Sequence, residues 1–180
     1  MRKLQIGVMG SAADLQYSEK IEAIAERVGE LIAKQNGILV FGAEKDSDSL
    51  STAACRGAKK AGGLTVGITY GKHKDVWEQG ADIIIPCGLE RGGGRETVLV
   101  LGCDAVIAIS GGSGTLTELV IAYQADIPMV GISGVGGWSE KLADTYIDGR
   151  ERRKVLGATT PEEAVSVAIR EAALYREQYG

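Results

Sequence analysis

The run Ala105–Ile109 is the sequence feature that most constrains the fold. Its five residues are all apolar, and a glycine-rich segment follows it directly. A short, unbroken apolar run that ends at a turn signal is typical of a parallel strand covered on both faces. Such a strand needs helices above and below its sheet, so the sequence predicts an α/β fold.

Strand-like and helix-like segments alternate along most of the chain. Short apolar runs predict further strands at 4–9, 38–41, 64–68, 83–86, 128–132 and 155–156. Apolar spacings of three and four, with capping residues and breakers, predict helical segments at 18–35, 49–61, 75–79, 95–102, 116–125 and 161–177. This alternation predicts a doubly wound parallel sheet of the Rossmann-like type.

Length and composition favour one domain without nucleic-acid or membrane partners. The 180 residues, 44% of them hydrophobic, suffice for one core, so 1–180 is expected to be a single domain. The 20 basic and 24 acidic residues give a net charge of −4, which excludes a basic nucleic-acid binder. No apolar stretch approaches the roughly 18 residues of a membrane helix, and residues 1–9 are too strand-like for a signal peptide. We therefore expect a cytoplasmic protein.

The cysteines and acidic loop residues do not predict a metal site. Cys55, Cys87 and Cys103 are odd in number, lack CxxC spacing and accompany a single histidine. We expect buried structural thiols and neither a zinc site nor a disulfide framework. Asp46 and Asp48 alternate with serines, a pattern more typical of a helix cap with solvated neighbours than of a divalent-ion site. We assign no metal ligands.

The segment after the Ala105–Ile109 run carries the strongest functional signal. Its glycines let backbone N–H groups converge, its hydroxyls add donors, and a helix start favours negative charge. A tight turn without a ligand does not need so many glycines and hydroxyls, so we interpret the segment as a phosphate-binding loop. We assign phosphate or ligand binding to Gly111, Gly112, Ser113, Gly114 and Thr115, and, after the first predicted strand, to Gly10 and Ser11.

Two common nucleotide-binding motifs are missing. The loop lacks the lysine of GxxxxGK[ST], and the first strand is not followed by GxGxxG. Glu44, just past the second predicted strand, is therefore interpreted as a solvated loop residue and not as the ribose-binding acid of a nicotinamide site. A dehydrogenase is only a third-ranked hypothesis.

Two charged residues are expected at the rim of the phosphate site. Glu118 lies four residues past Gly114, in the first turn of the predicted helix, and Arg95 opens another helix after a glycine run. An arginine and a carboxylate beside a phosphate suit chemistry at a ribose 5-phosphate, where positive charge develops as an N-glycosidic bond breaks. An Arg95–Glu118 ion pair that braces two helix starts explains the same residues equally well, and both interpretations stay open.

Arg95 and the segment 104–119 resemble a family motif. An arginine followed by PGGxGTxxE marks the "lonely guy" family, long mislabelled as lysine decarboxylases, and 56–58, 61–68 and 127–131 extend the resemblance across most of the chain. Its members include cytokinin-activating nucleoside 5′-monophosphate phosphoribohydrolases, and a shorter sister branch, which this sequence resembles more, includes molybdenum cofactor carrier proteins. The resemblance implies catalytic roles for Arg95 and Glu118 and a phosphate loop at 111–115.

The sequence departs from the motif at two places. Ser110 replaces the proline, which leaves the turn less rigid but removes no donor. The second glycine-rich loop, GGGxxGLM after the second strand, is replaced by the acidic segment 43–50. Acidic side chains at the ligand rim are expected to repel a phosphate unless Lys45 or a metal compensates.

The predicted helix 116–125 is apolar nearly all round, which favours self-association. One face is expected to pack on the sheet and another on a second subunit, in a homodimer or dimer of dimers. Trp138 either covers the site or packs at a subunit contact. The sequence thus predicts a protein that binds a phosphorylated small molecule. As an enzyme it would be a nucleoside 5′-monophosphate phosphoribohydrolase that requires no cofactor. As a non-enzyme it would carry a pterin phosphate such as the molybdenum cofactor.

Overall fold

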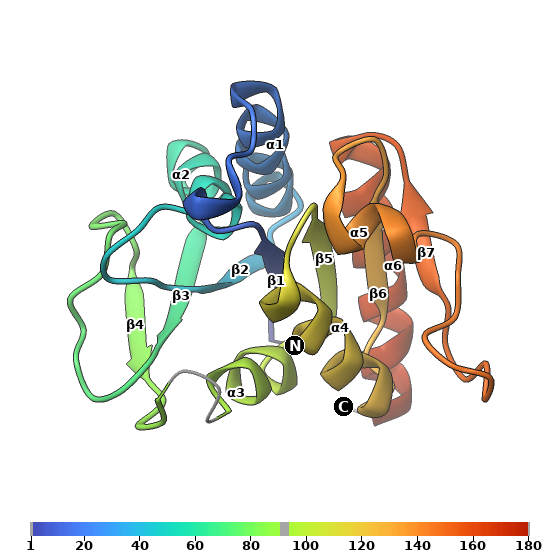
Figure 1. The fold of residues 1–180 in the computed structure, drawn as a ribbon. Helices are drawn as coiled ribbons and strands as arrows, with labels where there is room; N and C mark the ends of the chain where they lie inside the picture. The colour runs from blue at the N-terminus through green and yellow to red at the C-terminus, as the bar shows by residue number, and fades with distance from the viewer. Residues whose placement is uncertain (1, 91–93, 180) are drawn as a thin grey trace.

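The computed structural model describes residues 2–90 and 94–179, which build one parallel sheet between two layers of helices (Figure 1). The order across the sheet is β4-β3-β2-β1-β5-β6-β7. The strands are β1 (Gln5–Gly10), β2 (Ile38–Gly42), β3 (Leu64–Thr69), β4 (Ile83–Pro86), β5 (Ala105–Ile109), β6 (Met129–Ile132) and β7 (Val155–Ala158). The predicted doubly wound, Rossmann-like α/β fold is confirmed.

The two faces of the sheet have separate apolar cores. One core packs under α1 (Glu19–Lys34), α2 (Leu50–Lys60) and α6 (Pro161–Tyr179), and the other under α3 (Arg95–Leu101) and α4 (Ser113–Gln124). The central strand β5 is fully buried, as its unbroken apolar sequence predicts. Among the described residues, no helix combines the length and apolar character needed to cross a bilayer.

The sheet reverses its winding direction between β1 and β5, and the two strands end level with each other. Gly10 pairs with Ile109 in the register, so the loops that follow both strands leave the sheet side by side. Ser11 Oγ accepts the N–H of Gly111 at 2.9 Å and donates to Ser110 Oγ at 3.1 Å. In an open parallel sheet, such a reversal is where a crevice forms outside the carboxyl ends of the strands.

Two predicted helical segments differ from the structure. Helix α4 begins at Ser113 instead of 116, because Gly112 is the N-cap and its carbonyl already accepts the N–H of Leu116 at 3.1 Å. Residues 75–79 are not helical. Their backbone bonds elsewhere, since the Trp77 N–H donates to the Glu44 carbonyl at 2.8 Å. The first difference matters for the site, because the hydroxyl-bearing half of the glycine loop is the first turn of a helix.

A short helix that the sequence pattern did not predict supports the glycine loop from outside. This helix, α5 (Gly137–Leu142), packs against β5 and β6. The Trp138 N–H donates to the Gly111 carbonyl at 3.0 Å, and the Ser139 N–H donates to the Ser110 carbonyl at 2.9 Å. Of the predicted glycine-rich segment 88–94, residues 91–93 lie outside the described part of the chain.

Candidate ligand-binding site

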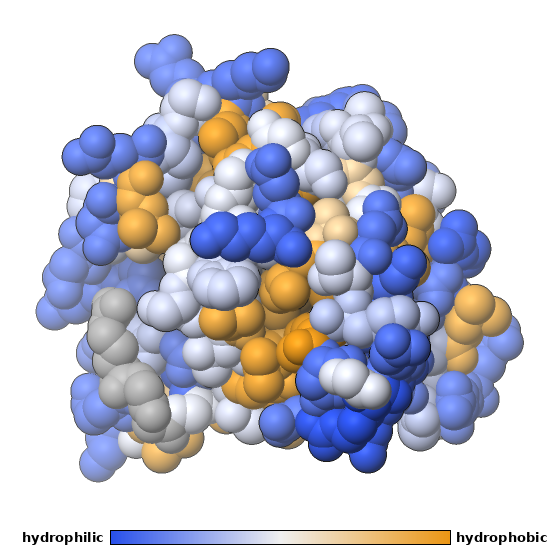
Figure 2. Space-filling view, turned by 45° about the vertical axis from the view of Figure 1, so that its right-hand side comes forward, coloured by the Kyte–Doolittle hydropathy of each residue, from blue (hydrophilic) through white to orange (hydrophobic). Residues whose placement is uncertain are grey.

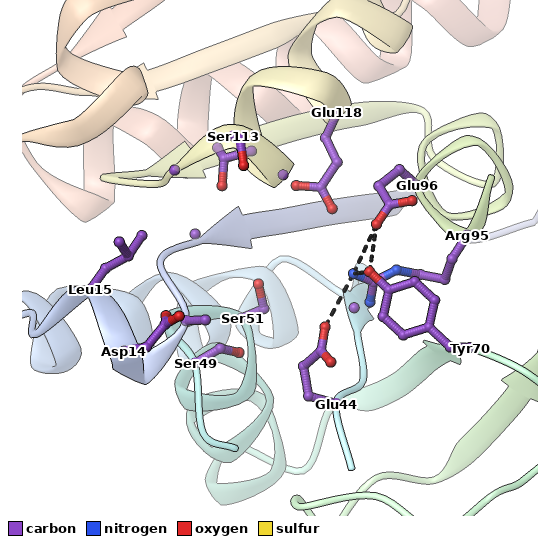
Figure 3. Close-up of a pocket in the computed structure, with 16 residues that line it drawn as sticks. Asp14, Leu15, Glu44, Ser49, Ser51, Tyr70, Arg95, Glu96, Ser113 and Glu118 are labelled. Carbon is purple, nitrogen blue, oxygen red and sulfur yellow. Dashed lines mark hydrogen bonds and ion pairs between the residues drawn. The ribbon is translucent and has the colours of Figure 1, made fainter. Parts of the chain in front are cut away.

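A cavity of about 250 Å³ opens at the carboxyl edge of the sheet, above the point where the winding reverses (Figure 3). Its walls come from the ends of β1 and β2, the loop after β3, and the first turns of α2, α3 and α4. A 3-10 turn, η1 (Ala13–Leu15), adds Asp14 and Leu15. The loops that follow strands β1, β2, β3 and β5 therefore meet around one cavity.

The N-terminus of α4 gives one wall of the cavity a set of free hydrogen-bond donors. Gly112, Ser113, Gly114 and Thr115 all line the cavity. Their backbone N–H groups donate to no acceptor within the described residues, and no side chain caps the helix. Free N–H groups and the helix dipole make such an end suited to an anion. Asp14 also lines the cavity but is exposed, so water and salt screen its charge.

The glycines of the loop have different structural roles. Gly111 has a φ of +97°, and a Cβ there would overlap the side chain of Thr115, so the loop requires glycine at this position. At Gly112 a Cβ would approach only Leu15 Cδ1, at 2.9 Å, and at Gly114 it would meet no atom within 4 Å. Gly111 therefore shapes the turn, whereas Gly112 and Gly114 leave space in the cavity.

The predicted binding residues divide between the cavity surface and the layer behind it. Gly10 lines the cavity together with residues 112–115. Ser11 is buried, and its hydroxyl holds the Gly111 N–H. This N–H is consequently not available to a ligand. Ser11 and Gly111 join the β1 and β5 loops, and the structure does not bring them to the cavity surface.

On the opposite side of the cavity, Arg95 is held in a buried polar cluster (Figure 3). Its Nη2 donates to Tyr70 Oη at 2.9 Å, to Glu44 Oε1 at 3.2 Å and to Glu96 Oε1 at 3.3 Å. Tyr70 in turn donates to Glu96 at 2.6 Å, and the guanidinium lies 4.3 Å from the centre of the Tyr70 ring. Gly42 leaves room for this guanidinium, because a Cβ there would overlap it. Arg95 Nε is buried and has no partner among the described residues.

Glu118 is a buried carboxyl that faces the cavity from α4. Only 6% of the residue is exposed, and it makes no hydrogen bond or ion pair with any described residue. Burial, against the lowering effect of Arg95 and together with the negative charges of Glu96 and Glu44, raises the pKa of Glu118 to about 8. Glu118 is therefore mostly neutral at pH 7.

The structure corrects two predictions about Glu118. It lies in the second turn of α4 and not in the first, because the helix begins earlier than predicted. The Arg95–Glu118 ion pair, one of the two interpretations that the sequence left open, does not form, because Glu44 and Glu96 pair with the guanidinium. Arg95 and Glu118 nevertheless line the same cavity, as the sequence predicts.

Glu44 was wrongly interpreted as a solvated residue. Its side chain is only 14% exposed, lines the cavity and forms an ion pair with Arg95. Tyr70 and Glu96 were not predicted as site residues at all. The signal that points to Glu44 and Tyr70 is their position directly after β2 and β3, at the edge where the glycine loop also lies. For Glu96 the signal is its place beside Arg95 in the first turn of α3.

The two aspartates of the acidic loop, Asp46 and Asp48, do not line the cavity, whereas Ser49 does. Asp48 accepts hydrogen bonds from Arg56 Nη1 at 3.1 Å and from the Ser49 N–H at 2.8 Å. Ser49 caps α2 by accepting the N–H of Thr52, so the predicted capping role is confirmed. Within residues 2–90 and 94–179, no group of three His, Cys, Asp or Glu side chains is arranged to hold a metal ion.

Comparisons with known proteins agree with this fold over most of the chain. Residues 3–165 match the family model described as the SLOG cluster4 family. An uncharacterized protein of Archaeoglobus fulgidus is 38% identical over 124 residues, which are 69% of this chain and 76% of that protein.

Solved structures of similar fold include proteins named for the molybdenum cofactor. The molybdenum cofactor binding protein of Rippkaea orientalis has a TM-score of 0.78 and 32% identity, covering 93% of this chain and 96% of its own. The molybdenum cofactor carrier protein of Chlamydomonas reinhardtii has a TM-score of 0.80 and 28% identity, covering 96% and 99%. These matches confirm the resemblance to the "lonely guy"-like proteins near the carrier branch. The chain belongs to the SLOG cluster4 family.

Proposed function

We propose that this protein binds a phosphorylated pterin of the molybdenum cofactor type and holds or carries it without converting it. The four unpaired backbone N–H groups at residues 112–115 are the observation that carries the proposal, because they present a ready anion site in the cavity wall. The names of the Rippkaea orientalis and Chlamydomonas reinhardtii proteins support the pterin part of the ligand.

The shape of the site suits a ligand with a phosphate and a ring system. A second hollow of about 400 Å³ adjoins the cavity and shares the walls formed by Tyr70, Glu96, Ser113 and Gly114. It extends between α3 and α4 past Thr97 and Thr117. A phosphate at the start of α4 would leave the rest of the main cavity, which Glu118 lines, and this adjoining hollow for a heterocycle.

Equilibrium binding tests the proposal. Titration calorimetry with the phosphate ester of 6-hydroxymethylpterin, with the unphosphorylated pterin and with adenosine 5′-monophosphate separates the contributions of phosphate and ring. The proposal expects the phosphorylated pterin to bind most tightly and the unphosphorylated pterin at least tenfold more weakly. A clear preference for adenosine monophosphate would contradict the pterin assignment.

A second candidate function is the hydrolysis of nucleoside 5′-monophosphates, which the family resemblance implies. The neutral Glu118 carboxyl in the cavity favours it, because a carboxyl with a pKa of about 8 suits a general acid that protonates a departing base. Glu118 in this protonation state cannot stabilise a sugar cation through a negative charge. Incubation with a panel of nucleoside monophosphates, followed by chromatography of the free base, decides between the two functions.

We further propose that the protein forms a homodimer or a dimer of dimers through α3 and α4. Val98 and Leu101 of α3 are 40% and 58% exposed, and Leu116, Val120 and Ile121 of α4 are only partly buried. Figure 2 shows apolar side chains gathered in the lower centre of the face on which α4 lies. A monomer in sedimentation experiments at micromolar concentration would contradict this proposal.

A further inference from the structure

Three carboxyl groups and one arginine lie together at the inner side of the cavity. Glu44 and Glu96 both accept from Arg95 Nη2, and Glu96 also accepts from Tyr70. Glu118 faces the same cluster from α4 but receives no hydrogen bond from the described residues (Figure 3). Arg95 Nη2 and the Tyr70 hydroxyl therefore donate to the other two acids, and Arg95 Nη1 donates to the Ile68 carbonyl at 3.5 Å.

A buried carboxyl without donors is far more stable neutral than ionised. An unpaired carboxylate at a residue that is 94% buried loses most of its contact with water, and no hydrogen-bond donor of the described residues replaces that water. The charged groups that face Glu118 are Arg95 and Glu96 of α3 and Glu44 after β2, and the two acids oppose a further negative charge. The titration of the buried Cys103 thiol is also coupled to that of Glu118. The raised pKa of Glu118 agrees with this geometry.

We propose that Glu118 is the specificity-determining contact for the ligand's ring, and that it binds there as a neutral carboxylic acid, donating one hydrogen bond and accepting one. This inference rests on the proposed function, since it concerns the ring of the phosphorylated ligand. It assigns that ring to the heterocycles that present a hydrogen-bond acceptor and an N–H donor on either side of one ring carbon. The lactam edge of a pterin and the N1 and amino group of adenine both have this pattern.

The position of Glu118 along α4 fits contact with a ring and not with the phosphate. Glu118 lies five residues after Ser113, which corresponds to about 7.5 Å along a helix at 1.5 Å per residue. The phosphate would occupy the start of the helix, and Glu118 would meet a group further along the ligand. A ligand edge with two donors would instead select an ionised carboxylate, so the protonation state of Glu118 in the complex identifies the edge.

The test measures binding of two probes, adenosine 5′-monophosphate and the phosphate ester of 6-hydroxymethylpterin, at pH 7 and pH 9. The proteins are wild type, Glu118→Ala, Glu118→Gln and the matched control Glu177→Gln, which removes a carboxylate at the far end of α6. A change in the protonation of the probe affects its binding to all four proteins, so it cancels when the affinities of two proteins are compared as a ratio at the same pH.

For each probe, we expect the ratio of the wild-type affinity to the Glu118→Gln affinity to fall about tenfold between pH 7 and pH 9. At pH 7, Glu118→Ala should lose about tenfold or more, and Glu118→Gln should rescue most of that loss, because an amide also offers one donor group and one acceptor. Glu177→Gln should follow wild type at both pH values.

Four outcomes would overturn the inference. A wild-type to Glu118→Gln ratio that is constant with pH, or a Glu118→Gln loss as large as that of Glu118→Ala, refutes it while leaving phosphate-ligand binding intact. A wild-type affinity that rises toward pH 9 shows contact with the ionised form and refutes it as well. If neither probe binds wild type, the proposed function fails and the inference fails with it.

Discussion

Replacing the buried Glu118 by glutamine is expected to stabilise the protein, by an amount that grows with pH. The pKa of Glu118 is raised from an ordinary value of 4.5 to about 8 in the folded state. The folded state therefore holds the proton over a pH range in which the unfolded state has lost it. Stability from this group is complete below about pH 4.5 and is lost as the pH rises through 8.

The expected magnitude follows from the size of the pKa shift. Each pH unit between the two pKa values corresponds to about 1.4 kcal/mol. The free energy of unfolding of wild type relative to Glu118→Gln should therefore fall by about 4 kcal/mol between pH 5 and pH 9. In a protein of this length, this corresponds to roughly 10 °C in the difference between the melting temperatures.

Urea denaturation of both proteins at pH 5, 7 and 9 measures this difference. Only the difference between the two proteins matters, because all other titrating groups are common to both. A constant offset across the pH range would show that Glu118 titrates at an ordinary pKa, and the neutral-acid argument would fail. A Glu118→Gln variant that is less stable than wild type at pH 9 would show that the carboxylate has a partner in solution.

Further substitutions separate the structural residues of the site from those at its surface. Gly112→Val should weaken binding of the pterin phosphate by at least tenfold in calorimetry and change the unfolding free energy by less than about 1 kcal/mol, since only the exposed Leu15 must move. Gly111→Ala should lower the unfolding free energy by about 1–3 kcal/mol in urea, because its φ is +97° and Thr115 blocks the Cβ. Arg95→Met should lower the unfolding free energy by about 3–5 kcal/mol in the same assay, because it leaves the buried Glu96 carboxylate without the guanidinium with which it pairs, and preserved stability would contradict the cluster.

The fold could be predicted from the sequence because its signals are local. The apolar run of β5 and the alternation of strands and helices both arise from neighbouring residues and survive in the structure. The start of α4 was placed too late because Ser113, Gly114 and Thr115 are weak helix formers. At a helix start, however, such residues are acceptable, because their N–H groups need no intrahelical partner.

The partners of Arg95 could not be predicted, because they depend on which strands become neighbours. Glu44 precedes Arg95 by 51 residues and Tyr70 precedes it by 25. Only the strand order brings the ends of β2 and β3 under the first turn of α3. In the sequence, Glu44 is followed by polar residues through Ser49, and this context is typical of a solvated loop.

The strand order also determines where the side chains of the acidic loop lie relative to the proposed phosphate site. The sequence predicted that these acids would repel a phosphate, but Asp48 is turned toward Arg56 and Glu44 lies with Arg95. Figure 3 places Glu44 near Arg95 and Tyr70, and Ser113 on the other side of the cavity. Glu44 therefore lies away from the anion site that we propose at the start of α4. Glu44 instead pairs with Arg95, and Glu118, which forms no direct ion pair with this arginine among the described residues, is mostly neutral at pH 7.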